Sequence, residues 1–410
     1  MARPSGSAVL PLHGGRVPQW LAGRMARLGR VISEAILLEY GRDELLRRLA
    51  HPFWFQSFGA VMGMDWHSSG ITTSVLGALK RGLEPVADEL GLYVCGGRGR
   101  ASRRTPDELR AAGEKSGVDG DAMARTSRLV AKVDSAAIQD GFALYLHGFI
   151  LAADGRWTVV QQGMRPDDHI ARRYHWLSEG LESFIDEPHA AVDGRPHGSI
   201  LNMTDRGAAA SRAAQLELIG GGPDPLLAEI ARARGAHPAP QLAMPGHHQV
   251  AASDVSLRRL HGALAAAAEV GPTRYEDLLL VPGVGARTVE ALALVAEVVH
   301  GAPSRFRDPA RFAYAHGGKD GTPFPVPLAV YDRTIAVMSD AVGKARLGND
   351  DRMAALRELD RQARALEAGA SGPSIEELFD RERRRSGELG GRTVQRANPI
   401  RAPQLRLPGL

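Results

Sequence analysis

The chain has 410 residues, of which 44% are hydrophobic and 24% charged, and this balance is that of a folded globular protein. No apolar run approaches the roughly 20 residues that cross a bilayer, and the N-terminus lacks the apolar stretch of a signal peptide. The single cysteine, Cys95, excludes a disulfide within the chain and a zinc site built from cysteines. We therefore expect a cytoplasmic protein.

Positive charge is concentrated at the C-terminus. The chain has a net charge of +4, but residues 381–410 hold eight Arg and two Glu, a balance of +6, so the first 380 residues sum to −2. A local basic segment of this kind is typical of binding to phosphate backbones. At its end, Gln404, Leu405, Leu407 and Leu410 are similar to the short peptides that bind the bacterial sliding clamp, although such a motif also occurs by chance.

The N-terminal third is expected to be mostly helical. Apolar residues recur at helical spacing from Leu21 to Arg48, and more helix is expected up to about residue 90. The run LGLYVCGG, residues 90–97, predicts a strand followed by a glycine-rich loop. Four arginines of this loop could follow a phosphate backbone, and a flexible solvated loop is the alternative. They are Arg98, Arg100, Arg103 and Arg104.

The middle of the chain changes character. Two β-rich runs joined by Ala153-Asp154-Gly155 predict a β-hairpin. Residues 169–185 and 209–220 are expected to be helical, and residues from 256 onward look all-helical. The predicted fold class is mixed α/β and mostly helical. Its parts are a helical N-terminal region (1–125), a small α+β candidate nuclease core with the β-hairpin (126–222), a linker (223–255), an all-α DNA-binding domain (256–370) and a basic disordered tail (371–410).

The most specific signal is the run YEDLLLVPGVGARTVEALALVAEVV, residues 275–299. It predicts a helix-hairpin-helix: a short helix over 275–280, a turn at Pro282–Gly285 and a longer helix from about Arg287. The two glycines of the turn permit backbone angles closed to other residues and would expose N–H groups at the second helix's start. Those N–H groups and the helix dipole fit a DNA phosphate. The expected contacts are Gly283, Val284, Gly285, Arg287 and Thr288.

Two alternatives to DNA binding stay open for this motif. One is a plain glycine-rich turn between packed helices, and the other is a helix-hairpin-helix that mediates only protein contacts. Contacts of the DNA-binding kind go to phosphates, so they would position the protein without reading the base sequence.

Seven phrases of the sequence point to one family. They are LPLHGG, HPFWFQSFG, DWHSSGITT, KVDSAAIQDGF, VVQQGM, ARRYHWLSE and FAYAHGGKDGTP. Through them the chain resembles, over most of residues 5–345, a widespread prokaryotic family called domain of unknown function 763 (DUF763). The resemblance implies a homodimeric DNA endonuclease. Within the last phrase, His316 and Asp320 could serve chemistry, with a capped loop as the alternative.

Polar residues flanking the β-hairpin are the first candidate for that chemistry. Cleavage of a phosphodiester usually takes one or two hard cations held by carboxylates. Asp134 and Asp140 would be the ligands of Mg²⁺ or Mn²⁺, Gln162 would complete the shell or orient water, and Lys132 would stabilise the developing charge. The alternative is a turn aspartate and surface amides. The returning strand reads Gln-Gln-Gly, which departs from the restriction-enzyme pattern, so that fold is not assigned.

Two further clusters could contribute. Asp65 and His67 lie in the dense polar phrase DWHSSGITT, which could line a cleft or could cap the next helix. Arg173 could hold the scissile phosphate with a bidentate contact, and His175 could transfer a proton. A solvated basic helix face is the alternative for this second pair.

These patterns predict a DNA-binding, nucleoid-associated protein of the cytoplasm. The first hypothesis is a metal-dependent DNA endonuclease acting in repair or recombination. A non-catalytic structural DNA-binding protein is the alternative. A base-excision glycosylase is a third hypothesis, because such enzymes also use the helix-hairpin-helix.

Overall fold

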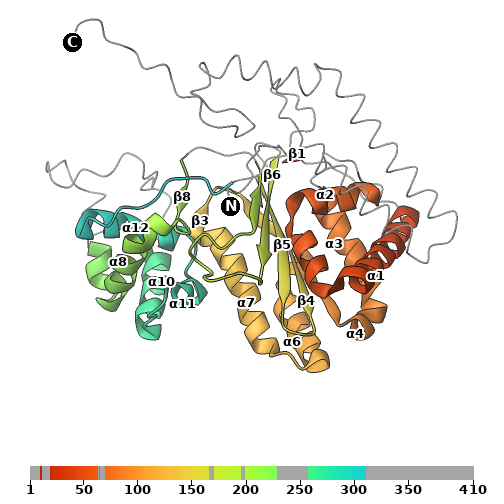
Figure 1. Ribbon diagram of the computed structural model, residues 1–410. Coiled ribbons are helices and arrows are strands. Elements are labelled where there is room, and N and C mark those ends of the chain that lie inside the picture. Colours follow the sequence, from red (N-terminus) through yellow and green to blue (C-terminus); the bar gives the residue numbers. More distant parts are fainter. Residues whose placement is uncertain are drawn as a thin grey trace, which may run out of the picture.

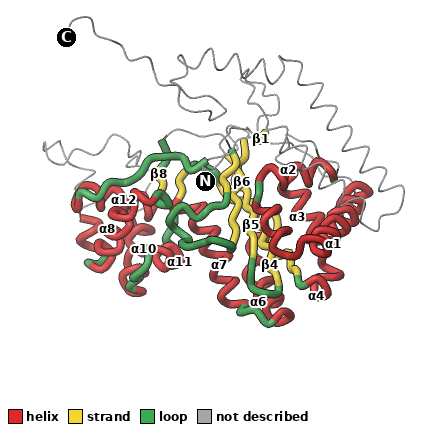
Figure 2. Tube along the Cα trace, in the orientation of Figure 1, coloured by secondary structure: helices red, strands yellow, loops and turns green. Residues whose placement is uncertain are grey.

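The computed structural model describes residues 10–11, 19–62, 64, 70–165, 170–194, 199–228 and 257–310. An antiparallel sheet runs through the centre, with helices on both of its sides (Figures 1 and 2). The chain is therefore mixed α/β, as the sequence predicts. Across these ranges, every helix is too short or too polar to span a membrane.

The main sheet has the strand order β1-β6-β5-β4-β2, and β7 also pairs with β6. All of these pairs are antiparallel, and the predicted strand near residue 94 and the predicted β4–β5 hairpin are both confirmed. Its strands are β1 (Leu10–Pro11), β2 (Leu92–Arg98), β4 (Ala143–Ala152), β5 (Trp157–Arg165), β6 (Ile170–Leu177) and β7 (Ala191–Asp193). A second, two-stranded sheet pairs β3 (Ile138–Gln139) with β8 (Leu201–Asn202).

One face of the main sheet is covered by the N-terminal helices α1 (Gln19–Ala50), α2 (Pro52–Val61) and α3 (Gly70–Leu83). The helix predicted from the spacing of apolar residues over Leu21–Arg48 is confirmed by α1. Gly41 has a positive φ of 84° and interrupts this helix. Leucines, isoleucines and phenylalanines of these helices form one buried cluster with the sheet. A short helix, α4 (Ala87–Leu90), leads from this layer into β2.

The other face is covered by helices α6 (Thr105–Ser116) and α7 (Gly120–Lys132), and the C-terminal helices pack beyond α7 (Figure 1). Those outer helices are α8 (Ala209–Gly220), α10 (Leu257–Val270), α11 (Tyr275–Leu280) and α12 (Ala286–His300). One continuous apolar core runs from the sheet through α7 into α11 and α12. The predicted boundary at residues 125–126 falls inside α7, and β2 shares its sheet with β4–β7.

Helix α7 ends in a single π-helical turn, Val133–Ala137. A π turn widens the helix locally, and such turns are frequent at functional sites. Here it turns Asp134 toward the sheet, where the side chain is completely buried, and leaves Ser135 exposed.

The helix predicted over residues 169–185 is wrong, because Ile170–Leu177 form the strand β6. Both faces of β6 are buried, so its residues read as a nearly continuous polar and aromatic run without the alternation of a half-exposed strand. The two arginines suggested a solvated helix face, but each lies buried on a different side of the sheet and has an acidic partner there.

Gly96 in β2 offers a test of how tightly β2 joins β4. Its φ is +90°, and a Cβ atom at this position would lie 2.2 Å from the carbonyl oxygen of His147. We expect Gly96→Ala to lower the free energy of unfolding by about 3 kcal/mol, since both the backbone conformation and the contact must change. Urea denaturation measures this. Gly77→Ala is the control, because an added Cβ there meets nothing within 4 Å inside a helix and should stabilise slightly.

Candidate functional site

Neighbouring residues of a strand point to opposite faces of a sheet, and this rule divides the polar residues of β5 and β6 into two groups. Gln161 and Arg172 face the α7 side, whereas Gln162 and Arg173 face the side of α1–α3. All four side chains are completely buried. Each face of the sheet therefore carries its own buried polar cluster.

On the α7 side, Asp134 is the centre of the first cluster. One of its carboxylate oxygens accepts hydrogen bonds from Gln161 Nε2 and from the indole Nε1 of Trp176, the latter at 2.9 Å. The other oxygen contacts His189 Nε2. Three donors from β5, β6 and the segment after β6 thus converge on one carboxylate, which meets the hydrogen-bonding needs of a buried acid.

A chain of hydrogen bonds extends this cluster to β4. The amide oxygen of Gln161 can only accept, so His147 Nδ1 donates to it across 2.6 Å. In the neutral ring, Nε2 then accepts from the hydroxyl of Ser127 at 2.8 Å. Burial lowers the pKa of His147 below its ordinary value of 6.5, and so favours this neutral form.

Asp140, which follows β3, is the centre of a second group of polar contacts, made nearer the start of β6. Its oxygens accept from Arg172 at 2.9 Å, from the Tyr174 hydroxyl at 2.6 Å and from the amide of Phe142 at 3.1 Å. Arg172 also makes a bidentate contact with Asp308, at 2.7 and 3.0 Å. Asp308 thereby joins the segment after α12 to the sheet.

On the side of α1–α3, three polar residues stand in one row across β5, β6 and β7. Gln162 pairs with Arg173, and Arg173 pairs with Asp193, in the register of the sheet. Arg173 Nη2 lies 2.6 Å from the amide oxygen of Gln56 in α2 and 3.2 Å from Asp193 Oδ2. Gln162 donates to the hydroxyl of Tyr145 and accepts from Thr72.

Two buried groups on this face, Asp193 of the row and His175 next to it, have atoms without a hydrogen-bond partner among the described residues. Both carboxylate oxygens of Asp193 have none, although Arg173 lies nearby, and burial raises the pKa of Asp193 to about 6. His175 donates through Nδ1 to the carbonyl of Leu49, which leaves Nε2 buried without a partner. Burial lowers the pKa of His175 well below 6.5, so the ring is neutral at pH 7.

The structure brings together only part of the predicted metal site. Gln162 lies on the opposite face from Asp134 and Asp140, and its neighbour Gln161 bonds Asp134 instead. Lys132 points away from both acids, and its Nζ contacts the carbonyl of Val284. Arg173 and His175 share the face of Gln162. Several predicted residues lie outside the described ranges: Asp65, His67, His316, Asp320 and the tail that contains Gln404–Leu410.

The acids fit a metal ion poorly as they stand. The oxygens of Asp134 and Asp140 point at N–H and O–H donors, and such donors occupy the lone pairs that a cation would need. Within the described ranges, no three His, Cys, Asp or Glu side chains form a group suited to hold a metal ion. The Mg²⁺ or Mn²⁺ site stays a prediction, and we derive no chemical step through it.

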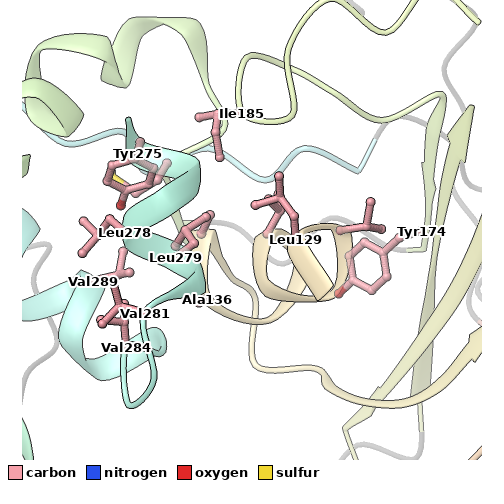
Figure 3. Close-up of a cluster of buried hydrophobic side chains, with 14 of the residues drawn as sticks. Leu129, Ala136, Tyr174, Ile185, Tyr275, Leu278, Leu279, Val281, Val284 and Val289 are labelled. Atoms are coloured by element: carbon pink, nitrogen blue, oxygen red, sulfur yellow. The ribbon is translucent and has the colours of Figure 1, made fainter. Parts of the chain in front are cut away.

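The third feature is the helical hairpin of α11 and α12. Helix α11 ends at Leu280 and α12 begins at Ala286, close to the predicted bounds. Figure 3 shows the apolar side chains of this hairpin packed together, with Leu279 on the side of Ala136, and all of them are buried. They include Tyr275, Leu278, Leu279, Val281, Val284 and Val289.

The tip of the hairpin is exposed although its base is buried. Pro282, Gly283 and Arg287 are exposed, whereas Val284 and Thr288 are buried. Gly283 has a φ of +88°, the conformation expected of a glycine in this turn. Among the described residues, no acceptor takes a hydrogen bond from the amides of Gly283, Gly285 or Ala286.

Two side chains near the π turn fix the hairpin to the rest of the protein. Lys132 Nζ contacts the carbonyl of Val284, and Gln139 Nε2 donates to the carbonyl of Ala286 at 2.7 Å. Burial lowers the pKa of Lys132. These bonds use the carbonyls of Val284 and Ala286 and none of the amides of Gly283, Gly285 and Ala286.

Sequence reasoning missed several members of the two clusters. Asp193 and Gln56 have no distinguishing neighbours in the sequence, because the register of β6 with β7 and the packing of α2 bring them to Arg173. Tyr174 and Trp176 lie in the run predicted to be a helix. As part of a strand, the alternation of ARRYHWL puts both on the face of Arg172.

Comparison with known proteins gives one match. The model of the family described as protein of unknown function (DUF763) matches residues 6–326. No curated protein and no solved structure matches the chain.

The neutral, buried histidines make stability depend on pH. The unfolded chain protonates His147 and His175 near pH 6.5, but the folded state does not. Their stabilising contribution is therefore complete above pH 6.5 and is lost as the pH falls toward the lower folded pKa, at up to about 1.4 kcal/mol per pH unit and histidine. We expect His147→Gln to reduce this slope by about one proton between pH 6.5 and 5, measured by urea unfolding. Equal slopes for the two proteins would contradict the assignment of a neutral His147.

Proposed function

This chain belongs to the DUF763 family, and we propose that it binds the DNA backbone through the α11–α12 hairpin. The observation that carries the proposal is the exposed tip of the hairpin. There the amides of Gly283, Gly285 and Ala286 have no acceptor within the described part of the chain, and Arg287 is exposed beside them.

The physical basis is the start of a helix. The first N–H groups of α12 have no carbonyl within the helix to bond, and the helix dipole adds roughly half a positive charge at this end. A phosphate oxygen accepts hydrogen bonds from such amides, and the Arg287 guanidinium adds a full positive charge. Since these groups contact phosphate and not base edges, binding would be independent of base sequence.

The attachment of the hairpin supports the same proposal. Lys132 and Gln139 bond carbonyls of the turn, and the side chains of Leu278, Leu279 and Val289 are completely buried. A site fixed in this way loses little conformational entropy when it binds a ligand. A hairpin that only connected two packed helices would not use these amides to bind a ligand. A negative charge placed beside them would then leave DNA binding unchanged, and this separates a DNA site from a plain turn.

Gly285 allows a sharp test. Its backbone is extended, with φ −152° and ψ −170°, it is the N-cap of α12, and an added Cβ meets nothing within 4 Å. Aspartate is a favoured N-cap residue, so Gly285→Asp should keep or raise stability while it places a negative charge at the proposed phosphate site. We expect duplex DNA to bind at least about tenfold more weakly, a change of about 1.4 kcal/mol, by fluorescence anisotropy.

Gly285→Asn is the matched control, because it offers a similar cap without the charge. We expect it to weaken binding less than Gly285→Asp does, with thermal melting of both variants at or above the wild-type temperature. If the aspartate variant is folded and binds duplex DNA as tightly as the wild type, the hairpin is not the DNA site.

Strand cleavage is a second candidate function, favoured by the Gln162–Arg173–Asp193 row. Carboxyl groups with raised pKa beside an arginine are typical of sites of acid–base chemistry, although structural ion pairs also shift pKa values. Asp193 has a pKa of about 6 and no hydrogen bond to either oxygen. It is thus a better candidate for proton transfer than Asp134 or Asp140, whose oxygens are occupied by donors.

The test of cleavage compares Asp193→Asn with the wild type on supercoiled plasmid, with Mg²⁺, Mn²⁺ or EDTA. We expect the wild type to nick the plasmid, and the variant to lose at least about a hundredfold in rate while it still binds duplex DNA. A wild type that never breaks a strand would leave the non-catalytic alternative. Undiminished cleavage by a folded Asp193→Asn would remove this residue from the mechanism.

A further inference from the structure

Arginines from separate parts of the sequence lie along the edge of the main sheet at which strands β2 and β5 end and β4 and β6 begin. Strand β2 ends there at Arg98, which pairs with Leu146 near the start of β4. Strand β5 ends there at Arg165, which pairs with Ile170 at the start of β6. The single helical turn α5 (Arg100–Arg103) follows β2 directly, so the predicted arginine-rich loop lies at this same edge.

The segment after α12 brings two more arginines to this edge. It crosses from α12 toward β6, as Figure 1 shows, and the carbonyls of Arg305 and Arg307 accept hydrogen bonds from Asn202 in β8. Its end is fixed by the bidentate contact between Asp308 and Arg172 of β6. The side chains of Arg305 and Arg307 are exposed.

The hairpin lies at the same edge. Lys132 at the end of α7 and Gln139 in β3 hold its turn, and β4 begins four residues after Gln139. From the hairpin to α5, the exposed arginines form what we call the arginine rim. Its members are Arg287, Arg305, Arg307, Arg98, Arg100, Arg103 and Arg104.

The acidic clusters at this edge are buried, while Asp107 at the start of α6 is exposed and pairs with Arg110. The aspartates of the two clusters that lie here, Asp140, Asp193 and Asp308, have nearly fully buried side chains and contact Arg172 or Arg173. The connection between β5 and β6 carries Asp167 and Asp168, which lie outside the described residues. In the described part of the chain, Arg100, Arg103 and Arg104 have no acidic partner.

We propose that the arginine rim binds the backbone of the same DNA duplex that the hairpin holds. This inference rests on the proposed function, and it names the ligand as duplex DNA long enough to reach from α12 to α5. A single charged loop could attract any polyanion. Exposed arginines from three separate segments, together with the start of α12, fit an extended, regularly charged partner.

The dimensions agree with several phosphate contacts. Neighbouring strands lie about 4.8 Å apart, so the three steps from β2 to β6 span about 14 Å. Duplex DNA carries one charge per roughly 1.7 Å of its axis, so a stretch of this length contains about eight phosphates on its two strands, and those on one side of the duplex face the protein. The hairpin adds its own contact beyond β3.

Binding to a long duplex tests the rim. We compare Arg100→Ala/Arg104→Ala with the wild type on a duplex of about 24 base pairs, which is much longer than the width of the sheet. We expect about tenfold weaker binding, and a salt slope lower by about 1.8, the value for two lost phosphate contacts.

Arg81→Ala/Lys115→Ala is the matched control. It also removes two positive charges, from the last turns of α3 and α6 at the opposite edge of the sheet, and should leave the affinity unchanged. If the rim variant binds the long duplex like the wild type, or no more weakly than this control, the inference is overturned. Failure of the hairpin proposal looks different, since Gly285→Asp would then retain wild-type affinity for the same duplex.

Discussion

The segment Lys132–Asp140 makes contacts in two directions, and both halves of the structure depend on them. Toward the sheet, Asp134 and Asp140 accept hydrogen bonds from β5, β6 and the segment after β6. Away from it, Lys132 and Gln139 bond the turn of the helical hairpin. The π turn makes this possible, because one extra residue in the last turn rotates the side chains that follow it. The sheet and the hairpin are therefore held by one short stretch of chain.

Buried charge is unusually dense around β6, and its cost explains how closely the parts are joined. Arg172 and Arg173 are each completely buried and each has an acidic partner from another element. Loss of one partner from such a pair costs about 3–5 kcal/mol, because it leaves an uncompensated buried charge. The C-terminal segment at Asp308 and the strand β7 at Asp193 are thus fixed to the sheet by these two arginines.

The fold could be predicted from the sequence where local signals are strong. The β4–β5 hairpin has a turn between two β-rich runs, and α11–α12 has Pro-Gly-Val-Gly between two apolar periodic runs; both elements are present. The prediction of a helix over residues 170–177 is wrong because a strand buried on both faces loses the alternation that identifies strands. The predicted grouping of Gln162 with Asp134 and Asp140 is wrong for a related reason. Strand alternation turns Gln162 to the face opposite Asp134, and its neighbour Gln161 bonds that acid instead.

The candidate residue types and the positions of the glycine turns follow from the sequence, because they depend on local backbone freedom and on side-chain charge. The arginines of residues 98–104 and the hairpin amides were likewise candidate contacts from the sequence alone. Which groups meet depends on the packing of the elements. Asp193 reaches Arg173 through strand register, and Lys132 turns from the acids to Val284 at the end of α7. Such contacts join residues far apart in the chain, so no local pattern specifies them.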